Sequence, residues 1–184
     1  MKNSLRGHFL AASPYLQDPN FARTVVLILQ HDNDGALGVV LNRSTDKTIQ
    51  QLWEEVDEPP CNNQDRLHVG GPVSGPLMAV HTVAALGEVE VLPGLFFSTQ
   101  KDHLEELVER EGIQSRLFVG HSGWGAEQLE SELQQGAWLT MPATLKDVFF
   151  DETQLWRYVT RQISARIMQS ALKIKHIPED PSMN

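Results

Sequence analysis

The run from Thr24 to Gln30 (TVVLILQ) constrains the fold more than any other stretch of this chain. It is almost wholly apolar and rich in β-branched side chains, which is typical of a strand buried on both faces of a sheet. The polar residues His31–Gly35 (HDNDG) separate it from a second apolar run, Ala36–Leu41 (ALGVVL). A short polar connection that ends in Asp-Gly predicts a β-hairpin, because glycine accepts the positive φ of such turns.

Helical and strand patterns alternate along the rest of the chain without a regular βαβ rhythm. Apolar residues at helical spacing predict helices at Thr48–Val56, Lys101–Glu111, Ala126–Gln135 and Glu152 to about Ile174. Short apolar or alternating runs predict strands at Leu67–Val69, Leu77–Val83, Glu88–Leu92, Leu95–Ser98, Arg116–Val119 and Ala137–Met141. Gly136 is expected to end the third helix as its C′ residue. This order favours an α+β protein with a mixed sheet and packed helices.

Composition predicts a soluble, cytoplasmic, single-domain protein covering residues 1–184. The apolar fraction of 41% is ordinary for a globular chain of 184 residues, and the formal net charge is −9. The single cysteine, Cys61, excludes an internal disulfide and suits a reducing compartment. No apolar run approaches the length of a membrane span, and Phe9–Ala12 is too short for a signal-peptide core. Residues 178–184 are expected to be a disordered tail.

A glycine-rich segment, Gly120–Gly125 (GHSGWG), lies between a predicted strand and a predicted helix. A turn of this kind can direct free backbone N–H groups and a helix N-terminus at an anion. It lacks the Lys-Ser/Thr pair of a phosphate-binding loop and has Trp124 instead. The alternative is a structural turn whose glycines let strand and helix pack closely, with Ser122 capping the helix.

The same segment begins a nucleophile elbow, G-x-S-x-G, but Trp124 stands where the final glycine belongs. A serine hydrolase would also need a base, for which His81 or His121 is available, with Asp147 or Asp151 to orient it. This alternative requires the Ser122 hydroxyl to lie within hydrogen-bonding distance of a histidine nitrogen.

A second loop rich in glycine and proline runs from Gly70 to Pro76 (GGPVSGP). Its glycines allow another backbone, or a ligand, to approach the chain closely; a structural turn between strands is the alternative. We expect the two loops to supply a ligand site if they meet. The candidate ligand-binding residues are Gly70, Gly71, Pro72, His81, Gly120, Ser122, Gly123 and Trp124.

Neither a metal nor another cofactor is expected. The seven histidines show no ligand spacing, and there is no cysteine pair. Positive charge gathers beside the last predicted helix, and the acidic balance of the whole chain argues against direct DNA binding. The basic residues there are Arg157, Arg161, Arg166, Lys173 and Lys175.

Several motifs in order resemble the YqgE/AlgH family of bacterial proteins. They are Arg6–Pro14 (RGHFLAASP), Asp18–Val26 (DPNFARTVV), Gly35–Arg43 (GALGVVLNR), Val69–Val73 (VGGPV), His81, Arg116–Leu133 (RLFVGHSGWGAEQLESEL) and Gly136–Pro142 (GAWLTMP). The resemblance implies a compact α+β domain with a bifurcated or barrel-like sheet surrounded by helices. The shared core would span about residues 5–150, with the C-terminal helix extending past it. The family's biochemical function is not established, and one branch carries the label of transcriptional regulator.

The sequence therefore favours a non-enzymatic protein that binds a small molecule or a protein partner, with an indirect regulatory role in transcription. Two alternatives stay open. One is a hydrolase or transferase that uses Ser122 or His81. The other is a nucleic-acid-binding regulator that uses the basic C-terminal helix.

Overall fold

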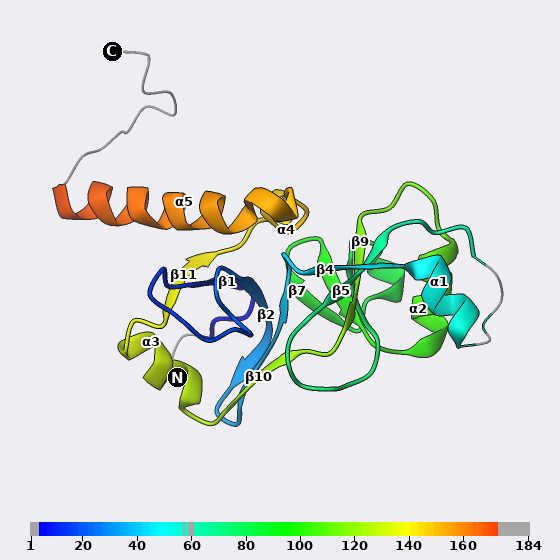
Figure 1. The fold of residues 1–184 in the computed structure, drawn as a ribbon, viewed down its shortest axis with the longest axis horizontal. Helices are drawn as coiled ribbons and strands as arrows, with labels where there is room; N and C mark the ends of the chain where they lie inside the picture. Colours follow the sequence, from blue (N-terminus) through cyan, green and yellow to red (C-terminus); the bar gives the residue numbers. More distant parts are fainter. Residues whose placement is uncertain (1–3, 57, 59–60, 173–184) are drawn as a thin grey trace, which may run out of the picture.

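The computed structural model describes residues 4–56, 58 and 61–172, and its course is shown in Figure 1. The strands are β1 (His8–Ala12), β2 (Val25–Asp32), β3 (Gly35–Val40), β4 (Ser44–Thr48), β5 (Arg66–Val69), β6 (Met78–His81), β7 (Val89–Leu92), β8 (Leu95–Ser98), β9 (Ser115–Val119), β10 (Ser122–Gly125) and β11 (Trp138–Pro142). The α-helices are α1 (Ile49–Glu55), α2 (Lys101–Glu109), α3 (Gln128–Gln134), α4 (Leu145–Val148) and α5 (Glu152–Leu172), and a 3₁₀ turn spans Ala84–Leu86.

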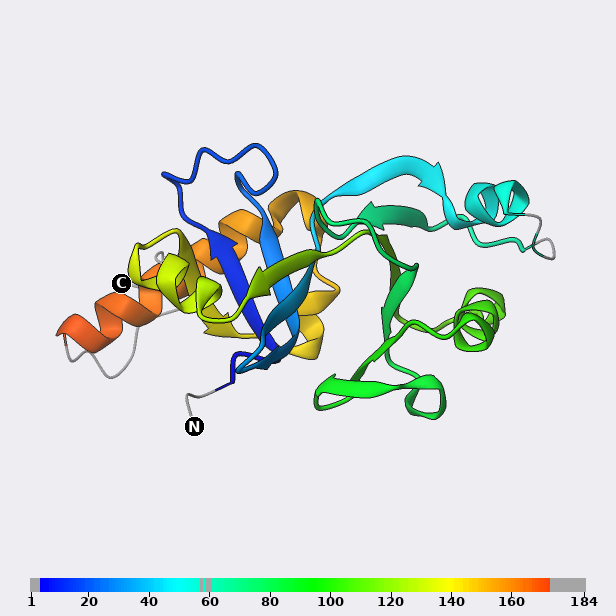
Figure 2. The same cartoon turned by 90° about the horizontal axis from the view of Figure 1, so that it is seen from below.

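The strands form two sheets. Sheet A has the order β10-β3-β2-β1-β11 and is antiparallel throughout, whereas sheet B has the order β4-β5-β9-β6-β8-β7 and contains one parallel pair, β5 with β9. All strands of sheet B lie in the chain between β3 and β10, which are neighbours in sheet A. Figure 2 shows the two sheets diverging from this junction. The α+β class and the divided sheet are confirmed, but neither sheet closes, so "barrel-like" describes the fold only loosely.

Both faces of sheet A are covered by other elements. Successive residues of β2 point to opposite faces and therefore belong to different clusters. Val25, Leu27 and Leu29 belong to a cluster that includes Leu155, Val159 and Ile163 of α5. Val26 and Ile28 belong to a cluster on the other face, with Leu129 of α3 and Trp124 and Trp138. Residues 25–29 are 0% exposed, which confirms the predicted strand buried on both faces.

Sheet B shares its core with sheet A on one face and with α1 and α2 on the other. Along β9, Phe118 joins the cluster under α5, whereas Leu117 joins Trp53 of α1 and Leu107 of α2. This alternation follows the two-residue period of a strand. The helices α1 and α2 therefore lie far from α5, as Figure 1 shows.

Several local predictions are confirmed. β2 and β3 form an antiparallel hairpin in which Asp32 lies opposite Gly35. Gly136 has φ +74° and follows the C-cap of α3, and its N–H donates to the Leu133 carbonyl. The Ala137 N–H donates to the Glu132 carbonyl, which completes the C-terminal capping motif.

Other predictions are corrected. Ser122–Gly125 is a strand that pairs with β3, and the following helix begins only at Gln128, so the predicted strand-to-helix turn is wrong. β1, β4 and α4 were not predicted, and the strand expected at Leu77–Val83 is limited to Met78–His81. The expected tail, residues 178–184, and the end of the predicted helix at Ile174 lie outside the described residues.

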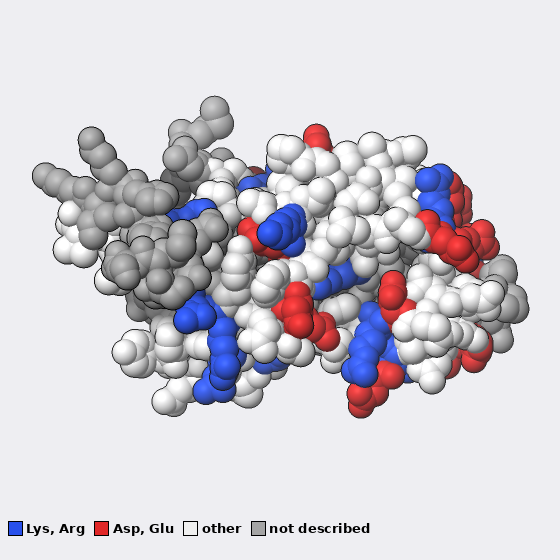
Figure 3. Space-filling view, turned by 90° about the horizontal axis from the view of Figure 1, so that it is seen from above, with Lys and Arg blue, Asp and Glu red and all other residues white. Residues whose placement is uncertain are grey.

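Two further observations concern the surface. None of the helices in the described ranges is long and apolar enough to cross a membrane. On the face drawn in Figure 3, several lysine and arginine side chains adjoin aspartate or glutamate, others form a small group without acidic neighbours, and uncharged surface separates these groups. The described part of this face therefore offers no continuous basic field of the kind that binds a phosphate backbone.

Candidate functional site

The two glycine-rich loops meet where the sheets diverge. The Gly70 N–H donates to the Val119 carbonyl at 2.9 Å, and the Gly70 carbonyl accepts from the Val40 N–H at 2.8 Å. The Ser122 hydroxyl donates to the same carbonyl at 3.1 Å. Val73 and His121 exchange two backbone hydrogen bonds, of 3.0 and 2.9 Å. Backbone contacts at Gly70 thus connect sheet A to sheet B.

The glycines are required because the two backbones touch. A Cβ atom on Gly70 would lie 2.4 Å from the Gly120 carbonyl oxygen, and one on Gly71 would lie 2.3 Å from the His121 carbonyl oxygen. Gly120 has φ +69°, a conformation that disfavours other residues. The predicted close approach of a second backbone is therefore confirmed for the Gly70 loop. Pro72 and Gly123 are exposed beside this contact, and ligand binding by these residues stays a prediction.

Ser122 does not occupy the position expected of a helix cap or a nucleophile. Its side chain is buried within β10 and donates to the Gly70 carbonyl, so the predicted capping role is wrong. Among residues 4–56, 58 and 61–172, no histidine makes a hydrogen bond with its hydroxyl. The geometry that the hydrolase alternative requires is therefore not assembled around Ser122.

His81 and Trp124 are also held by structural contacts. The His81 ring is fully buried, with Nε2 2.9 Å from the Ser98 hydroxyl and Nδ1 accepting from the Val83 N–H. Burial lowers the pKa of His81 to about 4, so the ring is neutral at pH 7. The Trp124 indole is almost fully buried and donates to the Glu132 carboxylate at 2.9 Å.

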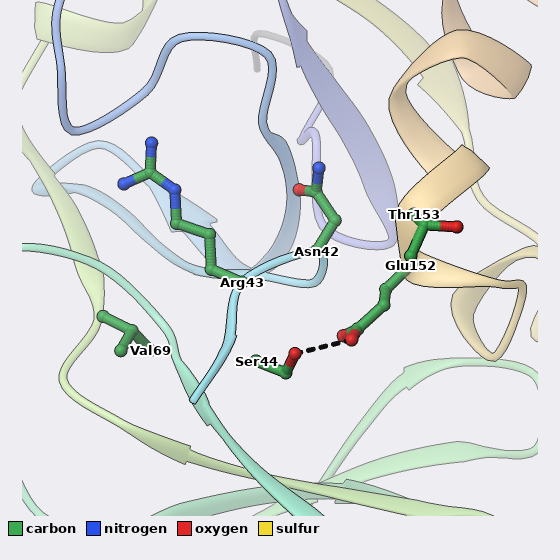
Figure 4. A pocket seen from close by; sticks show the side chains of 6 residues that line it. All are labelled: Asn42, Arg43, Ser44, Val69, Glu152 and Thr153. Atoms are coloured by element: carbon green, nitrogen blue, oxygen red, sulfur yellow. Dashed lines mark hydrogen bonds between the residues drawn. The ribbon is translucent and has the colours of Figure 1, made fainter. Parts of the chain in front are cut away.

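A surface hollow of about 510 Å³ lies beside this junction, and we call it the junction hollow. It is lined by Asn42, Arg43, Ser44, Val69, Glu152 and Thr153 (Figure 4). Asn42 and Arg43 belong to the connection between β3 and β4, Ser44 begins β4, Val69 ends β5, and Glu152 begins α5. Sheet B, the connection that leads to it from sheet A, and the longest helix described thus contribute to one site.

The Glu152 carboxylate lines the junction hollow and makes hydrogen bonds with two side chains of sheet B. Its Oε1 accepts from the Ser44 hydroxyl at 2.6 Å, and its Oε2 lies 3.0 Å from Nε2 of His68. Figure 4 shows the Ser44 and Glu152 side chains pointing toward one another. The Glu152 side chain is 27% exposed, whereas that of His68 is 9% exposed. The carboxylate is therefore positioned from the protein side and open on the other.

His68 lies behind Glu152 and is held neutral. Burial lowers its pKa, the nearby Arg116 guanidinium lowers it further, and Glu152 opposes both. A neutral imidazole beside a carboxylate oxygen donates through Nε2–H, which fixes the tautomer. Arg116 is itself fixed, since its guanidinium donates to the Leu41 carbonyl at 2.9 Å and the Phe150 carbonyl at 2.8 Å. Burial also lowers the pKa of Arg116.

This order of groups differs from the serine–histidine pair of a serine hydrolase. The Ser44 hydroxyl donates its proton to a carboxylate and not to an imidazole. On the opposite wall, the Arg43 guanidinium donates to the Pro19 carbonyl and lies away from Glu152 (Figure 4). The junction hollow therefore combines a carboxylate, a guanidinium and the half-exposed side chain of Val69.

None of the residues around Glu152 was predicted as a site. His68 was considered only as a metal ligand, and Glu152 only as the start of a helix. Within the described chain, no three His, Cys, Asp or Glu side chains are grouped as a metal ligand set. The junction hollow is formed by three segments that are far apart in sequence (residues 42–44, Val69 and residues 152–153), so no local spacing identifies it.

Together, these features define an open two-sheet α+β protein with a surface hollow beside the sheet junction. The chain belongs to the AlgH-like family, which it matches over residues 9–168. It is 37% identical to a UPF0301 protein of Chlorobaculum tepidum, over 97% of this chain and 95% of the relative. It is also 37% identical to a UPF0301 protein of Streptomyces coelicolor, over 99% and 96% of the two chains.

Solved structures agree with this assignment. The solution structure of the AlgH protein from Pseudomonas aeruginosa superposes with a TM-score of 0.68 at 30% identity, covering 97% of each chain. A crystal structure of a Corynebacterium diphtheriae protein gives a TM-score of 0.70 at 26% identity, covering 88% of each chain. The predicted resemblance to the YqgE/AlgH family is confirmed.

Proposed function

We propose that this protein is a non-enzymatic module that binds a small organic amine, amino acids included, in the junction hollow. The observation that carries the proposal is the Glu152 carboxylate. Each of its oxygens accepts one hydrogen bond from the protein, and the side chain is still 27% exposed. A carboxylate oxygen has a second acceptor position, so a ligand N–H or O–H donor can bind without displacing Ser44 or His68.

The other walls of the junction hollow define the rest of the ligand. Val69 offers apolar surface in the same hollow as Glu152, which suits a short hydrocarbon portion of a ligand. Arg43 retains donors beyond the one used on Pro19, and a guanidinium favours a carboxylate or phosphate. Asn42 is less available, because its amide already bonds the Val25 N–H and the Arg23 carbonyl. A zwitterion with its ammonium at Glu152 matches these charges.

A regulatory role follows from the position of Glu152 as the first residue of α5. A ligand on Glu152 acts on the hydrogen bonds that hold α5 to sheet B, and α5 extends from there across sheet A. Any effect on transcription would thus pass through a partner protein and not through DNA. Contacts from Gly70, Gly71 or Ser122 to the same ligand stay a prediction.

The test is a thermal-shift screen followed by calorimetry on the full chain. The probes are the twenty amino acids, ethanolamine and putrescine, with acetate and inorganic phosphate as anions without an amine. We expect an amine-bearing probe to raise the melting temperature and its effect to be lost in Glu152→Gln. Glu109→Gln, an exposed position on α2, is the matched control and should bind as the parent does.

A second variant tests the proposal even if Glu152→Gln does not fold. Val69→Phe fills the junction hollow from the surface and should abolish binding while the unfolding transition is kept. Absence of any amine-dependent shift would refute the proposal. Binding that survives both Glu152→Gln and Val69→Phe would place the ligand elsewhere and refute it equally.

A further inference from the structure

A second cavity lies between α1 and α2, and we call it the α1–α2 cleft. Its volume is about 300 Å³, at the lower end of the range for sites that bind small molecules. The two helices cover the face of sheet B that is turned away from the core shared with sheet A. The cleft shares no lining residue with the junction hollow, so the two sites are separate.

Most of the cleft wall is apolar. Its apolar residues are Leu52, Trp53 and Val56 of α1, Leu104 of α2, and Leu77 and Val119, which come from the ends of sheet B segments. Trp53 and Leu104 are each only 5% exposed, whereas Val56 is 52% exposed. The cleft therefore extends from the buried cluster under the two helices to an apolar rim in solvent. Covering that surface with a hydrocarbon group favours binding.

The remaining side of the cleft is polar, and its charges are paired with one another. The Lys101 ammonium lies 2.6 Å from Oε1 of Glu58 and 3.4 Å from Oε1 of Glu105. The hydrogen bond between Lys101 and Glu58 raises the pKa of the ammonium and lowers the pKa of the carboxyl, so both are charged at pH 7. The Thr99 hydroxyl donates to Oε2 of Glu88 at 3.1 Å, so it can only accept a hydrogen bond from a ligand.

We infer that the α1–α2 cleft binds an uncharged small molecule with a hydrocarbon body of about one ring and a hydroxyl group. The apolar wall and the volume suit the body of that molecule. Its hydroxyl has a proton to donate, and the polar side offers acceptors at Thr99, Glu58 and Glu105. The junction hollow takes no part in this site, so the inference does not depend on the proposed ligand.

The paired charges argue against a charged occupant. An anion would meet two carboxylates, and the one cation that lines the cleft, Lys101, is already bound to both of them. A cation would have to lie beside the Lys101 ammonium or displace it from Glu58 and Glu105. An uncharged ligand leaves this ion-paired group intact, so it avoids the cost of separating the charges.

The experiment is an NMR titration of the full chain, read from the methyl signals of Leu52, Leu77, Leu104 and Val119. Three probes share a phenyl body and differ in charge: phenethyl alcohol is uncharged, phenethylamine is a cation and phenylacetate is an anion. We expect phenethyl alcohol to bind at least about tenfold tighter than phenylacetate, and more tightly than the amine. Because affinity is read at the cleft, an amine bound in the junction hollow does not enter the comparison.

Variants that line the cleft test its geometry. Leu77→Phe places a larger side chain in the cleft and should weaken phenethyl alcohol about tenfold. Val56→Ser, at the exposed rim, should weaken it about threefold and tests the site even if Leu77→Phe does not fold. Glu105→Gln removes one negative charge and should strengthen phenylacetate about threefold without changing phenethyl alcohol. Glu106→Gln, an exposed position on α2 that does not line the cleft, is the control and should change neither.

Each contrary outcome overturns the inference. Absence of methyl shifts with phenethyl alcohol would show that the cleft binds no such molecule. Equal or tighter binding of phenylacetate or phenethylamine at these signals would assign the cleft to a charged ligand. Binding that survives both Leu77→Phe and Val56→Ser would place the alcohol elsewhere. Shifts of the same signals with protein concentration alone, together with a dimer in sedimentation, would assign the cleft to a second copy of this chain.

Discussion

Gly70→Ala provides a sharp test of the view that the glycine-rich loops hold the two sheets together. The backbone of Gly70 does not require positive φ, so any effect of the added methyl group comes from packing. That Cβ would lie 2.4 Å from the Gly120 carbonyl oxygen and 3.1 Å from Cγ1 of Val39. The nearer contact is with backbone, so it can be relieved only by moving one of the two loops.

The expected cost follows from what such a movement disturbs. Forcing an extra methyl group into a packed site costs about 1–3 kcal/mol. Gly70 also makes the hydrogen bonds to Val119, Val40 and Ser122, and each such bond contributes about 1 kcal/mol. Weakening part of this set brings the total to about 3 kcal/mol. For a chain of 184 residues, that corresponds to a melting temperature lower by roughly 10 °C.

Urea unfolding followed by tryptophan fluorescence measures this loss, and Gly123→Ala is its control. A Cβ on Gly123 would have its nearest neighbour, Cδ2 of His121, at 3.8 Å, so that variant should stay within about 0.5 kcal/mol of the parent. If Gly70→Ala loses less than about 1 kcal/mol, the junction is not packed as described and the structural role of the loops is refuted.

Two further predictions concern buried polar groups. The pKa of His81 is about 4 in the folded protein and near its ordinary value in the unfolded chain. The contribution of neutral His81 to the free energy of unfolding is therefore complete above about pH 6.5 and declines toward pH 4. The free energy of unfolding should fall over this range by up to about 3 kcal/mol more in the parent than in His81→Gln; parallel pH profiles would contradict this. Oε2 of Glu132 accepts from the indoles of both Trp124 and Trp138, at 2.9 and 2.8 Å. Glu132→Ala should therefore cost about 2–4 kcal/mol in urea unfolding, and Glu132→Gln clearly less, whereas equal losses would show that the acceptor oxygen is unimportant.

The elements that sequence predicted well are those determined by neighbouring residues. The run Val25–Leu29 is apolar at every position because both of its faces are covered, and Asp-Gly marks the hairpin that follows. Gly136 ends α3 through hydrogen bonds with the last turn of that helix, so its role depends only on neighbouring residues. Features that neighbouring residues determine can be predicted from the local sequence pattern without knowledge of the rest of the fold.

The strands that were missed depend on distant partners. β4 (STDKT) is polar because it is an edge strand, and β10 (SGWG) contains glycines that are usually depleted from strands. β10 exists because β3 offers it a hydrogen-bonding edge, with Ser122 opposite Gly38. A glycine-rich segment between a strand and a helix therefore gave the signature of a turn.

The candidate site could not be predicted for a related reason. Ser44, His68 and Glu152 come from β4, β5 and α5, and no spacing along the chain relates them. Each is an ordinary polar residue in its own segment. Only the divergence of the two sheets places them around one hollow, so knowledge of the topology has to precede knowledge of the site.

The location of sheet B within the chain has a consequence for folding. Its strands form one long excursion between β3 and β10, and the two ends of that excursion lie side by side in sheet A. Closing so long a loop carries a larger entropic cost than closing the hairpin of β2 and β3. The apolar edge of β3 therefore stays unpaired until the strands of sheet B have folded and β10 can pair with β3. During synthesis, that interval is when this protein is most exposed to edge-to-edge aggregation.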